Sequence, residues 1–197
     1  MELILIRHGE AEGNNKNSCV GKTDVALTPK GVRQMQTLSR NFYNDMVTAI
    51  YTSPLKRAVE SADAVNKYHN LPIEVVYDLE ERDYGIWENK TFAEIEENHK
   101  EEYEMWQKDW KGYEIPMGES SIKAYDRNIR ALKQILESNA NGKVIVVTHE
   151  AVIKNIIAYL LDMDLDATWH FKVKNAAVTR FEIDEDGYAT MLSFNEI

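Results

Sequence analysis

The chain has 197 residues, of which 44% are hydrophobic and 28% are charged, as in an ordinary globular protein. A chain of this length buries roughly 70% of the surface that its unfolded form exposes, so its core requires no metal ion or disulfide. Cys19 is the only cysteine, which excludes an internal disulfide, a four-cysteine zinc site and an iron–sulfur cluster. The net charge of −10 repels nucleic acid and anionic membranes, so we expect neither as a partner.

The N-terminal apolar run, residues 3–6, is followed at once by Arg7 and His8. Such a short run cannot span a membrane or serve as the apolar part of a secretion signal. We therefore expect the mature domain to begin at Met1. The single cysteine agrees with a reducing compartment, so we expect a cytoplasmic protein.

Short apolar runs alternate with stretches of helical periodicity, which predicts buried strands in a largely parallel sheet. The strands are expected at residues 3–6, 49–51, 73–77 and 144–147. The helices are expected at about residues 29–43, 55–68, 121–136 and 151–161. Thr28-Pro29 and Ser53-Pro54 each resemble a helix N-cap followed by proline at the first helical position.

Two further apolar runs near the C-terminus, residues 178–183 and 188–194, flank Asp186-Gly187. That dipeptide is typical of a hairpin turn, so one of these strands should run antiparallel to the rest of the sheet.

The segment of residues 89–119 is acidic, has no strand pattern and carries four large aromatic residues, Tyr103, Trp106, Trp110 and Tyr113. We interpret it as a helical, lid-like insertion in a single domain spanning residues 1–197. The alternative is that these aromatics, at three- to four-residue spacing, pack against the protein's own core.

Polar side chains that suit phosphate binding follow three of the predicted strands. Arg7 and His8 come after the first strand, Arg57 lies in the first helical turn after the second, and His149 ends the fourth. Because the carboxyl ends of parallel strands meet at one edge, two arginines and two histidines should gather there. Each one alone would be interpreted as a surface arginine or a core histidine.

Together these residues suit a phosphate dianion, because arginine binds its oxygens bidentately and helix N-termini add positive charge. A neutral imidazole is a nucleophile near pH 7, so one histidine can attack phosphorus. We also expect Gly9 to allow a sharp turn of the backbone after His8.

The same residues resemble a known family. Leu5-Ile6-Arg7-His8-Gly9-Glu10, followed by Asn14, is similar to the signature of the histidine phosphatase superfamily, which is phosphoglycerate mutase-like in fold. Further similar blocks follow in the family's order: Gly21-Lys22-Thr23-Asp24 with Leu27-Thr28-Pro29-Lys30-Gly31, Tyr51-Thr52-Ser53-Pro54-Leu55-Lys56-Arg57-Ala58, Leu79-Glu80-Glu81-Arg82-Asp83-Tyr84-Gly85-Ile86-Trp87-Glu88, Gly118-Glu119-Ser120 and Val146-Val147-Thr148-His149. The resemblance covers residues 3 to about 157. Within the superfamily the chain resembles the phosphatase branch, which includes alpha-ribazole phosphatases and broad-specificity phosphatases.

The resemblance implies a role for each matching position. These are His8 as the nucleophile, Arg7, Arg57 and His149 as ligands of the phosphoryl oxygens, Asn14 and Gly21 as residues lining the phosphate pocket, and Glu81 as the general acid. An alkoxide leaving group requires such a proton donor. Glu80 is the competing acid, and Glu81 is preferred on the Leu-x-Glu register.

The implied fold is α/β, a three-layer α/β/α sandwich whose mostly parallel sheet has an antiparallel edge. No metal or cofactor is expected. An H-E-x-x-H zinc motif is excluded because Ile153 stands where its second histidine is required.

Three positions depart from the family's pattern: Ala11, Asn89 and Glu150. Glu150, where family members usually have glycine, matters most because of its negative charge. A carboxylate beside the phosphate pocket would weaken anion binding or raise the pKa of His149.

We therefore expect a phosphomonoester hydrolase that acts on a small organic phosphate; the sequence leaves the oligomeric state open. A phosphoglycerate mutase with the same site is the first alternative. Such a mutase must bind a doubly anionic substrate, but acidic residues outnumber lysines by eight to four between residues 89 and 118, so hydrolysis is favoured. A non-catalytic, phosphate-binding regulatory protein is the second alternative, which the presence of His8 and Glu81 disfavours.

We also expect a preference for monophosphates with an uncharged, flat or apolar group, because the aromatics of residues 89–119 can stack on a ring.

Overall fold

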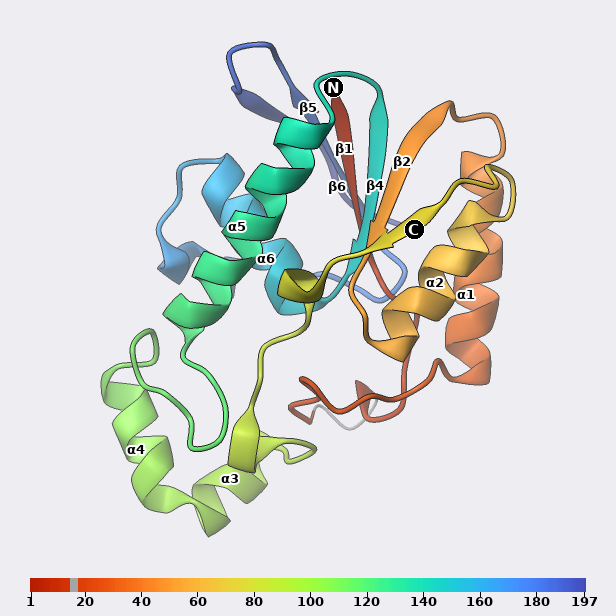
Figure 1. Cartoon of the computed structure of the whole chain (residues 1–197). Coiled ribbons are helices and arrows are strands. Elements are labelled where there is room, and N and C mark those ends of the chain that lie inside the picture. Colours follow the sequence, from red (N-terminus) through yellow and green to blue (C-terminus); the bar gives the residue numbers. More distant parts are fainter. Residues whose placement is uncertain (15–17) are drawn as a thin grey trace.

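The computed structural model describes residues 1–14 and 18–197, and at its centre lies a six-stranded sheet with the order β3-β2-β4-β1-β5-β6 (Figure 1). The strands are β1 (Glu2–Arg7), β2 (Val47–Thr52), β3 (Ile73–Val75), β4 (Lys143–Thr148), β5 (Val178–Ile183) and β6 (Ala189–Glu196). The first four strands are parallel, whereas β5 is antiparallel to β1 and β6 is antiparallel to β5. The predicted parallel sheet with an antiparallel edge is confirmed.

Helices cover both faces of the sheet (Figure 1). The helices α1 (Pro29–Ser39) and α2 (Lys56–Asn66) lie on one face, and α5 (Ser121–Ser138) and α6 (Glu150–Leu160) lie on the other. Because successive strand residues point to opposite faces, Ile4 and Ile6 pack toward α1 and α2 while Leu3 and Leu5 pack toward α5 and α6. The continuous apolar run of β1 thus serves two cores, and the predicted three-layer fold is confirmed.

The starts of α1 and α2 differ from each other. Thr28 caps α1 as predicted, since its hydroxyl accepts a hydrogen bond from the backbone N–H of Gly31 at 3.1 Å. The cap predicted at Ser53 is wrong, because α2 begins at Lys56 and Leu55 occupies the cap position. The Ser53 hydroxyl lies instead 2.7 Å from His149 Nε2, so the residue contributes to the polar edge of the sheet.

The strand predicted at residues 73–77 is shorter and less buried than expected. Its last part forms a 3-10 helix, η3 (Tyr77–Leu79), and β3 lies at the edge of the sheet with Glu74 and Val75 exposed. The hairpin prediction is confirmed, because β5 and β6 are joined by a turn in which Gly187 has a φ of 84°. Further 3-10 helices in the described residues are η2 (Arg40–Phe42), η4 (Gly85–Trp87) and η5 (Leu165–His170).

The segment of residues 89–119 contains α3 (Phe92–Asn98) and α4 (Lys100–Lys108), which lie beyond the carboxyl ends of the parallel strands (Figure 1). It packs on a small cluster separate from the two cores beside the sheet. That cluster is formed by Cys19, Trp87, Ile95 and Ile115, with Tyr84, Ile86, Tyr103, Trp106 and Tyr113 packed against it. Over residues 1–14 and 18–197, no helix has the length and apolarity needed to cross a membrane.

Candidate active site

The sheet register brings the ends of three strands together. Arg7, the last residue of β1, pairs with Thr148 at the end of β4, and Thr52 at the end of β2 pairs with Val147. His8 and His149 follow directly, and Arg57 lies in the first turn of α2. All three side chains are almost wholly buried, with 2%, 0% and 1% of their surface exposed. The burial of so much cationic and polar character at one edge is costly unless a ligand or partner compensates it.

The contacts of His8 define which of its nitrogens carries the proton. Nδ1 lies 2.7 Å from the carbonyl of Gly9, which can only accept, so Nδ1 is the donor. Nε2 accepts a long hydrogen bond of 3.3 Å from Nε of Arg57. Burial lowers the pKa of His8 well below its usual value of 6.5, and the charges of Arg7 and Arg57 lower it further. The ring is therefore neutral near pH 7, with its lone pair on Nε2.

The φ of Gly9 is not positive, so no left-handed backbone conformation requires a glycine there, and the sharp turn expected after His8 stays a prediction. A side-chain carbon at Gly9 would instead lie 2.6 Å from the carbonyl oxygen of Gly31, at the start of α1. The Gly9 N–H donates to the hydroxyl of Ser61 at 3.1 Å, a contact that the sequence did not reveal.

The guanidinium of Arg57 is held by main-chain carbonyls. Its Nη1 and Nη2 donate to the carbonyls of Thr23 and Gly21 at 2.9 and 2.7 Å. The N–H of Gly21 donates to the Glu88 carboxylate at 3.1 Å, and a side-chain carbon at Gly21 would lie 2.0 Å from the carbonyl oxygen of Arg82. In this structure Gly21 therefore contacts Arg57, and its predicted place in the phosphate pocket stays a prediction.

His149 and Arg7 complete the cationic cluster. The His149 ring lies edge-on to His8 with 5.1 Å between ring centroids, and burial lowers the pKa of His149 well below 6.5, as do the charges of Arg57 and Arg7. Among the described residues, His149 Nδ1 and Arg7 Nε are buried without a hydrogen-bond partner. Bound phosphate oxygens would supply acceptors for such groups.

Asn14 lies close to the backbone of the first strand end. Its side-chain oxygen accepts hydrogen bonds from the N–H of Ala11 at 3.0 Å and from Nδ2 of Asn175 at 3.1 Å. Asn175 also donates to the carbonyl of His8 at 3.3 Å. Asn175 was missed in the sequence, because it lies in a connection before β5 with no recognisable pattern around it.

Glu150 forms ion pairs with two neighbours. Its carboxylate oxygens lie 2.7 Å from Nη1 of Arg7 and 2.8 Å from Nζ of Lys154. The expectation that Glu150 raises the pKa of His149 is wrong, because burial and the surrounding positive charges lower that pKa. The remaining expectation, weaker anion binding, has a direct physical basis here, since Glu150 competes for Arg7.

We expect Glu150→Gln to bind inorganic phosphate about two- to fivefold more tightly, because phosphate no longer displaces a partly exposed carboxylate from Arg7. The measurement is the inhibition constant of phosphate against a chromogenic ester. Glu185→Gln, an exposed change in the β5–β6 turn, controls for the altered net charge. An unchanged or larger inhibition constant for Glu150→Gln would show that the ion pair does not compete with the anion.

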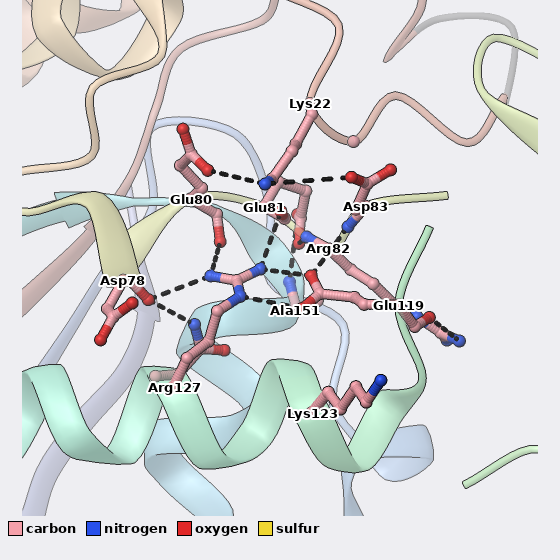
Figure 2. Close-up of polar contacts among 12 residues, drawn as sticks. Lys22, Asp78, Glu80, Glu81, Arg82, Asp83, Glu119, Lys123, Arg127 and Ala151 are labelled. Carbon is pink, nitrogen blue, oxygen red and sulfur yellow. Dashed lines mark hydrogen bonds and ion pairs between the residues drawn. The ribbon is translucent and has the colours of Figure 1, made fainter. Parts of the chain in front are cut away.

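The two candidate acids occupy different surroundings (Figure 2). Glu81 is 7% exposed, and its carboxylate accepts hydrogen bonds from the backbone N–H groups of Arg82 at 2.8 Å and Ala151 at 3.3 Å. Glu80 instead pairs with Lys22 at 3.2 Å. Burial raises the pKa of Glu81, although its backbone hydrogen bonds and the charge of Arg57 oppose the rise. Glu81 is therefore a carboxyl group that can retain a proton. It lies beside Ala151, two residues after His149.

A cavity of about 240 Å³ is lined in part by Ala151, whose backbone N–H donates to the Glu81 carboxylate; Glu81, Arg7, His8, Arg57 and His149 are not among its lining residues. Six of its fourteen lining residues are aromatic, and the lining comes from Arg82, Tyr84, Trp87, Phe92, Trp106, Trp110, Ser121, Ala124, Ala151, Lys154, Asn155, Leu165, Thr168 and Trp169. Of the four aromatics singled out in residues 89–119, Trp106 and Trp110 line the cavity. Tyr103 and Tyr113 do not, and they stack on Trp106 and Trp87 instead. Over the described part of the chain, no group of three or more His, Cys, Asp or Glu side chains is arranged to hold a metal ion.

Comparison with known proteins gives consistent matches over the whole chain. The sequence profile of the family described as "Histidine phosphatase superfamily (branch 1)" matches residues 3–196. The chain is 29% identical to the adenosylcobalamin/alpha-ribazole phosphatase of Escherichia coli (strain K12), over 99% of this chain and 96% of that protein. It is also 29% identical to phosphoserine phosphatase 1 of Hydrogenobacter thermophilus, over 94% and 88% of the two chains. The crystal structure of the alpha-ribazole phosphatase from Shigella flexneri superposes with a TM-score of 0.92 at 28% identity, covering 100% of this chain and 96% of that one.

Proposed function

The chain belongs to branch 1 of the histidine phosphatase superfamily, and on that premise we propose that this phosphatase hydrolyses small organic phosphomonoesters through a phosphohistidine at His8. The observation that carries the proposal is the neutral, buried His8, whose Nε2 lone pair lies among Arg7, Arg57 and His149. A phosphoryl group bound by these three residues would sit against the nucleophile.

In the proposed first step, His8 Nε2 attacks phosphorus in line with the leaving oxygen. The N–P bond forms as the P–O bond to the alcohol breaks, and the departing oxygen takes the proton of Glu81. In the second step, a water oxygen attacks the phosphohistidine while the Glu81 carboxylate accepts the water's proton. The N–P bond then breaks, its electron pair returns to Nε2, and inorganic phosphate leaves. Arg7, Arg57 and His149 hold the phosphoryl oxygens during both steps.

The aromatic cavity supports a preference for one kind of alcohol. Ala151 lines it and also donates to Glu81, beside which the leaving group must lie to receive a proton, and Trp106, Trp110 and Trp169 contribute to its lining. An uncharged ring is stabilised there by stacking, whereas a second phosphate or carboxylate finds Lys154 already paired with Glu150. We infer that nucleotide-like or other ring-bearing monophosphates are better substrates than polyanions such as 2,3-bisphosphoglycerate. The same argument favours hydrolysis over a mutase reaction.

We expect Trp110→Ala to lower kcat/KM about fivefold for a ring-bearing ester such as alpha-ribazole phosphate, because one stacking contact is lost. For phosphoserine and 3-phosphoglycerate the change should be within about twofold, since neither has a ring to stack. The measurement is phosphate release from these esters and from 2,3-bisphosphoglycerate, by wild type, Trp110→Ala and Trp106→Ala.

Tyr113→Leu is the matched control, because this aromatic of the same segment is absent from the cavity lining. It should leave the ranking of substrates unchanged. A wild type that prefers 2,3-bisphosphoglycerate, or that transfers phosphoryl groups to phosphoglycerate faster than to water, would contradict the proposal and favour the mutase.

A further inference from the structure

The loop that carries Glu81, residues 78–83, is here called the acid loop. Its backbone is held by side chains from other elements through four successive carbonyl groups, three of which accept from Arg127 (Figure 2). Arg127 of α5 donates to the carbonyls of residues 78, 80 and 81 at 3.0, 2.7 and 3.0 Å. Thr148 at the end of β4 donates its hydroxyl to the carbonyl of Leu79 at 2.8 Å. The acid loop is thus fixed through its main chain.

All the hydrogen-bond donors of Arg127 are engaged. A guanidinium has five N–H groups, and the two that do not bind the acid loop's carbonyls donate to Glu119. Nε lies 3.0 Å from Glu119 Oε2 and Nη2 lies 2.6 Å from Oε1. Glu119 also accepts from the N–H of Asp83 at 2.9 Å, at the other end of the acid loop. Arg127 and Glu119 together therefore bind both ends of the loop.

The pair is shielded from solvent, since 13% of the Arg127 side chain and 15% of the Glu119 side chain are exposed. Burial acts to raise the pKa of Glu119, but the hydrogen bonds and charge of Arg127 hold it below the ordinary value. Glu119 is therefore charged at neutral pH. A buried bidentate pair of this kind is geometrically strict, because the planar fork of arginine matches a carboxylate in one orientation.

The Glu81 carboxylate itself is bound only by main-chain groups in the described residues, the N–H of Arg82 and the N–H of Ala151. Arg82 belongs to the acid loop, and Ala151 lies in the first turn of α6. The place of the acid therefore depends on how the acid loop sits against α6. Arg127 and Glu119 hold the acid loop together with Thr148, and in the described chain neither of the pair hydrogen-bonds to the cationic cluster of Arg7, His8, Arg57 and His149.

We propose that Arg127 and Glu119 are positioning residues for the general acid: they hold the acid loop so that the Glu81 carboxyl group reaches the leaving oxygen. The inference rests on the proposed function, in which Glu81 donates the proton. Without the pair, the phosphate-binding residues and His8 keep their geometry, while proton delivery fails. The simpler alternative is that the pair stabilises the fold and nothing more.

The test compares esters that need proton assistance with esters that do not. For Arg127→Gln and Glu119→Gln we expect kcat/KM to fall about 10²-fold with an alkyl phosphate and about threefold or less with p-nitrophenyl phosphate, whose leaving group needs little protonation. Arg127→Lys should not restore the alkyl activity, because three flexible donors cannot replace five in a planar fork. Glu119→Gln keeps the size of the side chain and gives the same comparison if Arg127→Gln fails to fold.

Arg130→Gln is the matched control. Arg130 lies one turn along the same helix and binds Asp78 too, but through the partly exposed side-chain carboxylate at 2.8 Å and not through the backbone. It should leave the activity toward both esters near that of wild type. Arg127→Gln combined with Glu81→Gln should be no slower with the alkyl ester than Glu81→Gln alone, since both changes remove the same step.

The inference would be overturned if Arg127→Gln and Glu119→Gln lost equal activity with both ester types, and if these losses added to that of Glu81→Gln. The ion pair would then have only a structural role. A Glu81→Gln variant with no dependence on the leaving group would contradict the acid assignment in the proposed function, and the positioning role would fail with it. The two failures are therefore distinguished by whether Glu81→Gln alone shows the ester dependence.

Discussion

Replacement of His8 by alanine is expected to abolish phosphate release from alkyl and aryl esters alike, by at least about 10⁴-fold in kcat. The reason is that, in the proposed mechanism, His8 forms the covalent intermediate while Arg7, Arg57 and His149 bind the phosphoryl oxygens. The wild-type enzyme, stopped during turnover without acid, should carry one phosphoryl group on Nε2 of His8, because Nδ1 is occupied by the carbonyl of Gly9. Intact mass and phosphorus NMR measure both the amount and the attachment.

His170→Ala is a suitable control, because this exposed histidine of η5 lies outside the cluster. It should retain wild-type turnover and phosphorylation. An active His8→Ala variant, or rapid hydrolysis with no phosphoenzyme detectable under any quench, would exclude the proposed intermediate.

Glu81→Gln is expected to slow hydrolysis of alkyl phosphates by about 10²- to 10⁴-fold and to change hydrolysis of p-nitrophenyl phosphate far less. The amide keeps the shape of the side chain but cannot donate a proton to an alkoxide. Burial raises the pKa of Glu81, so the wild-type carboxyl stays protonated to a higher pH than an exposed glutamate. Activity toward alkyl esters should therefore fall as the pH rises through that raised pKa, and the variant should lose this dependence.

Glu80→Gln provides the comparison, because the Glu80 carboxylate pairs with Lys22 on the surface side of the acid loop. Its effect on either ester should be small. A larger loss at Glu80 than at Glu81, or an equal loss of Glu81→Gln on both ester types, would show that the acid is assigned to the wrong residue.

Much of the fold follows from local patterns in the sequence. The bounds of β5 agree with the apolar run of residues 178–183, and the strand ends at Arg7 and Thr148 are brought together by ordinary parallel pairing. The candidate residues at those ends could be predicted for the same reason, since strand order and direction place them at one edge. The family resemblance then supplied the roles of Glu81 and Asn14, which no local pattern indicates.

What could not be predicted depends on contacts between distant segments. The sequence Ser53-Pro54 has the pattern of a helix cap, but a hydrogen bond to His149, 96 positions away, draws the hydroxyl to the sheet edge. Trp169 lies in a 3-10 helix without clear periodicity, and only packing places it against Trp110. The many bonds of Arg127 are likewise invisible in its helical pattern, because carbonyl groups carry no side-chain identity. Sequence identifies the reacting groups more readily than the groups that orient them.

The small cluster around Trp87 and Ile95 is separate from the two cores beside the sheet, and this separation has a consequence for how the enzyme can evolve. The candidate phosphate ligands are anchored in β1, β2, β4 and the helices that follow, whereas much of the cavity for the alcohol is carried by residues 84–110 and η5. Mutations in Trp106 or Trp110 can reshape that cavity without disturbing the packing beneath His8. If the cavity binds the alcohol as proposed, selection can change which alcohol is accepted while the hydrolytic chemistry is inherited intact, through substitutions in these two segments.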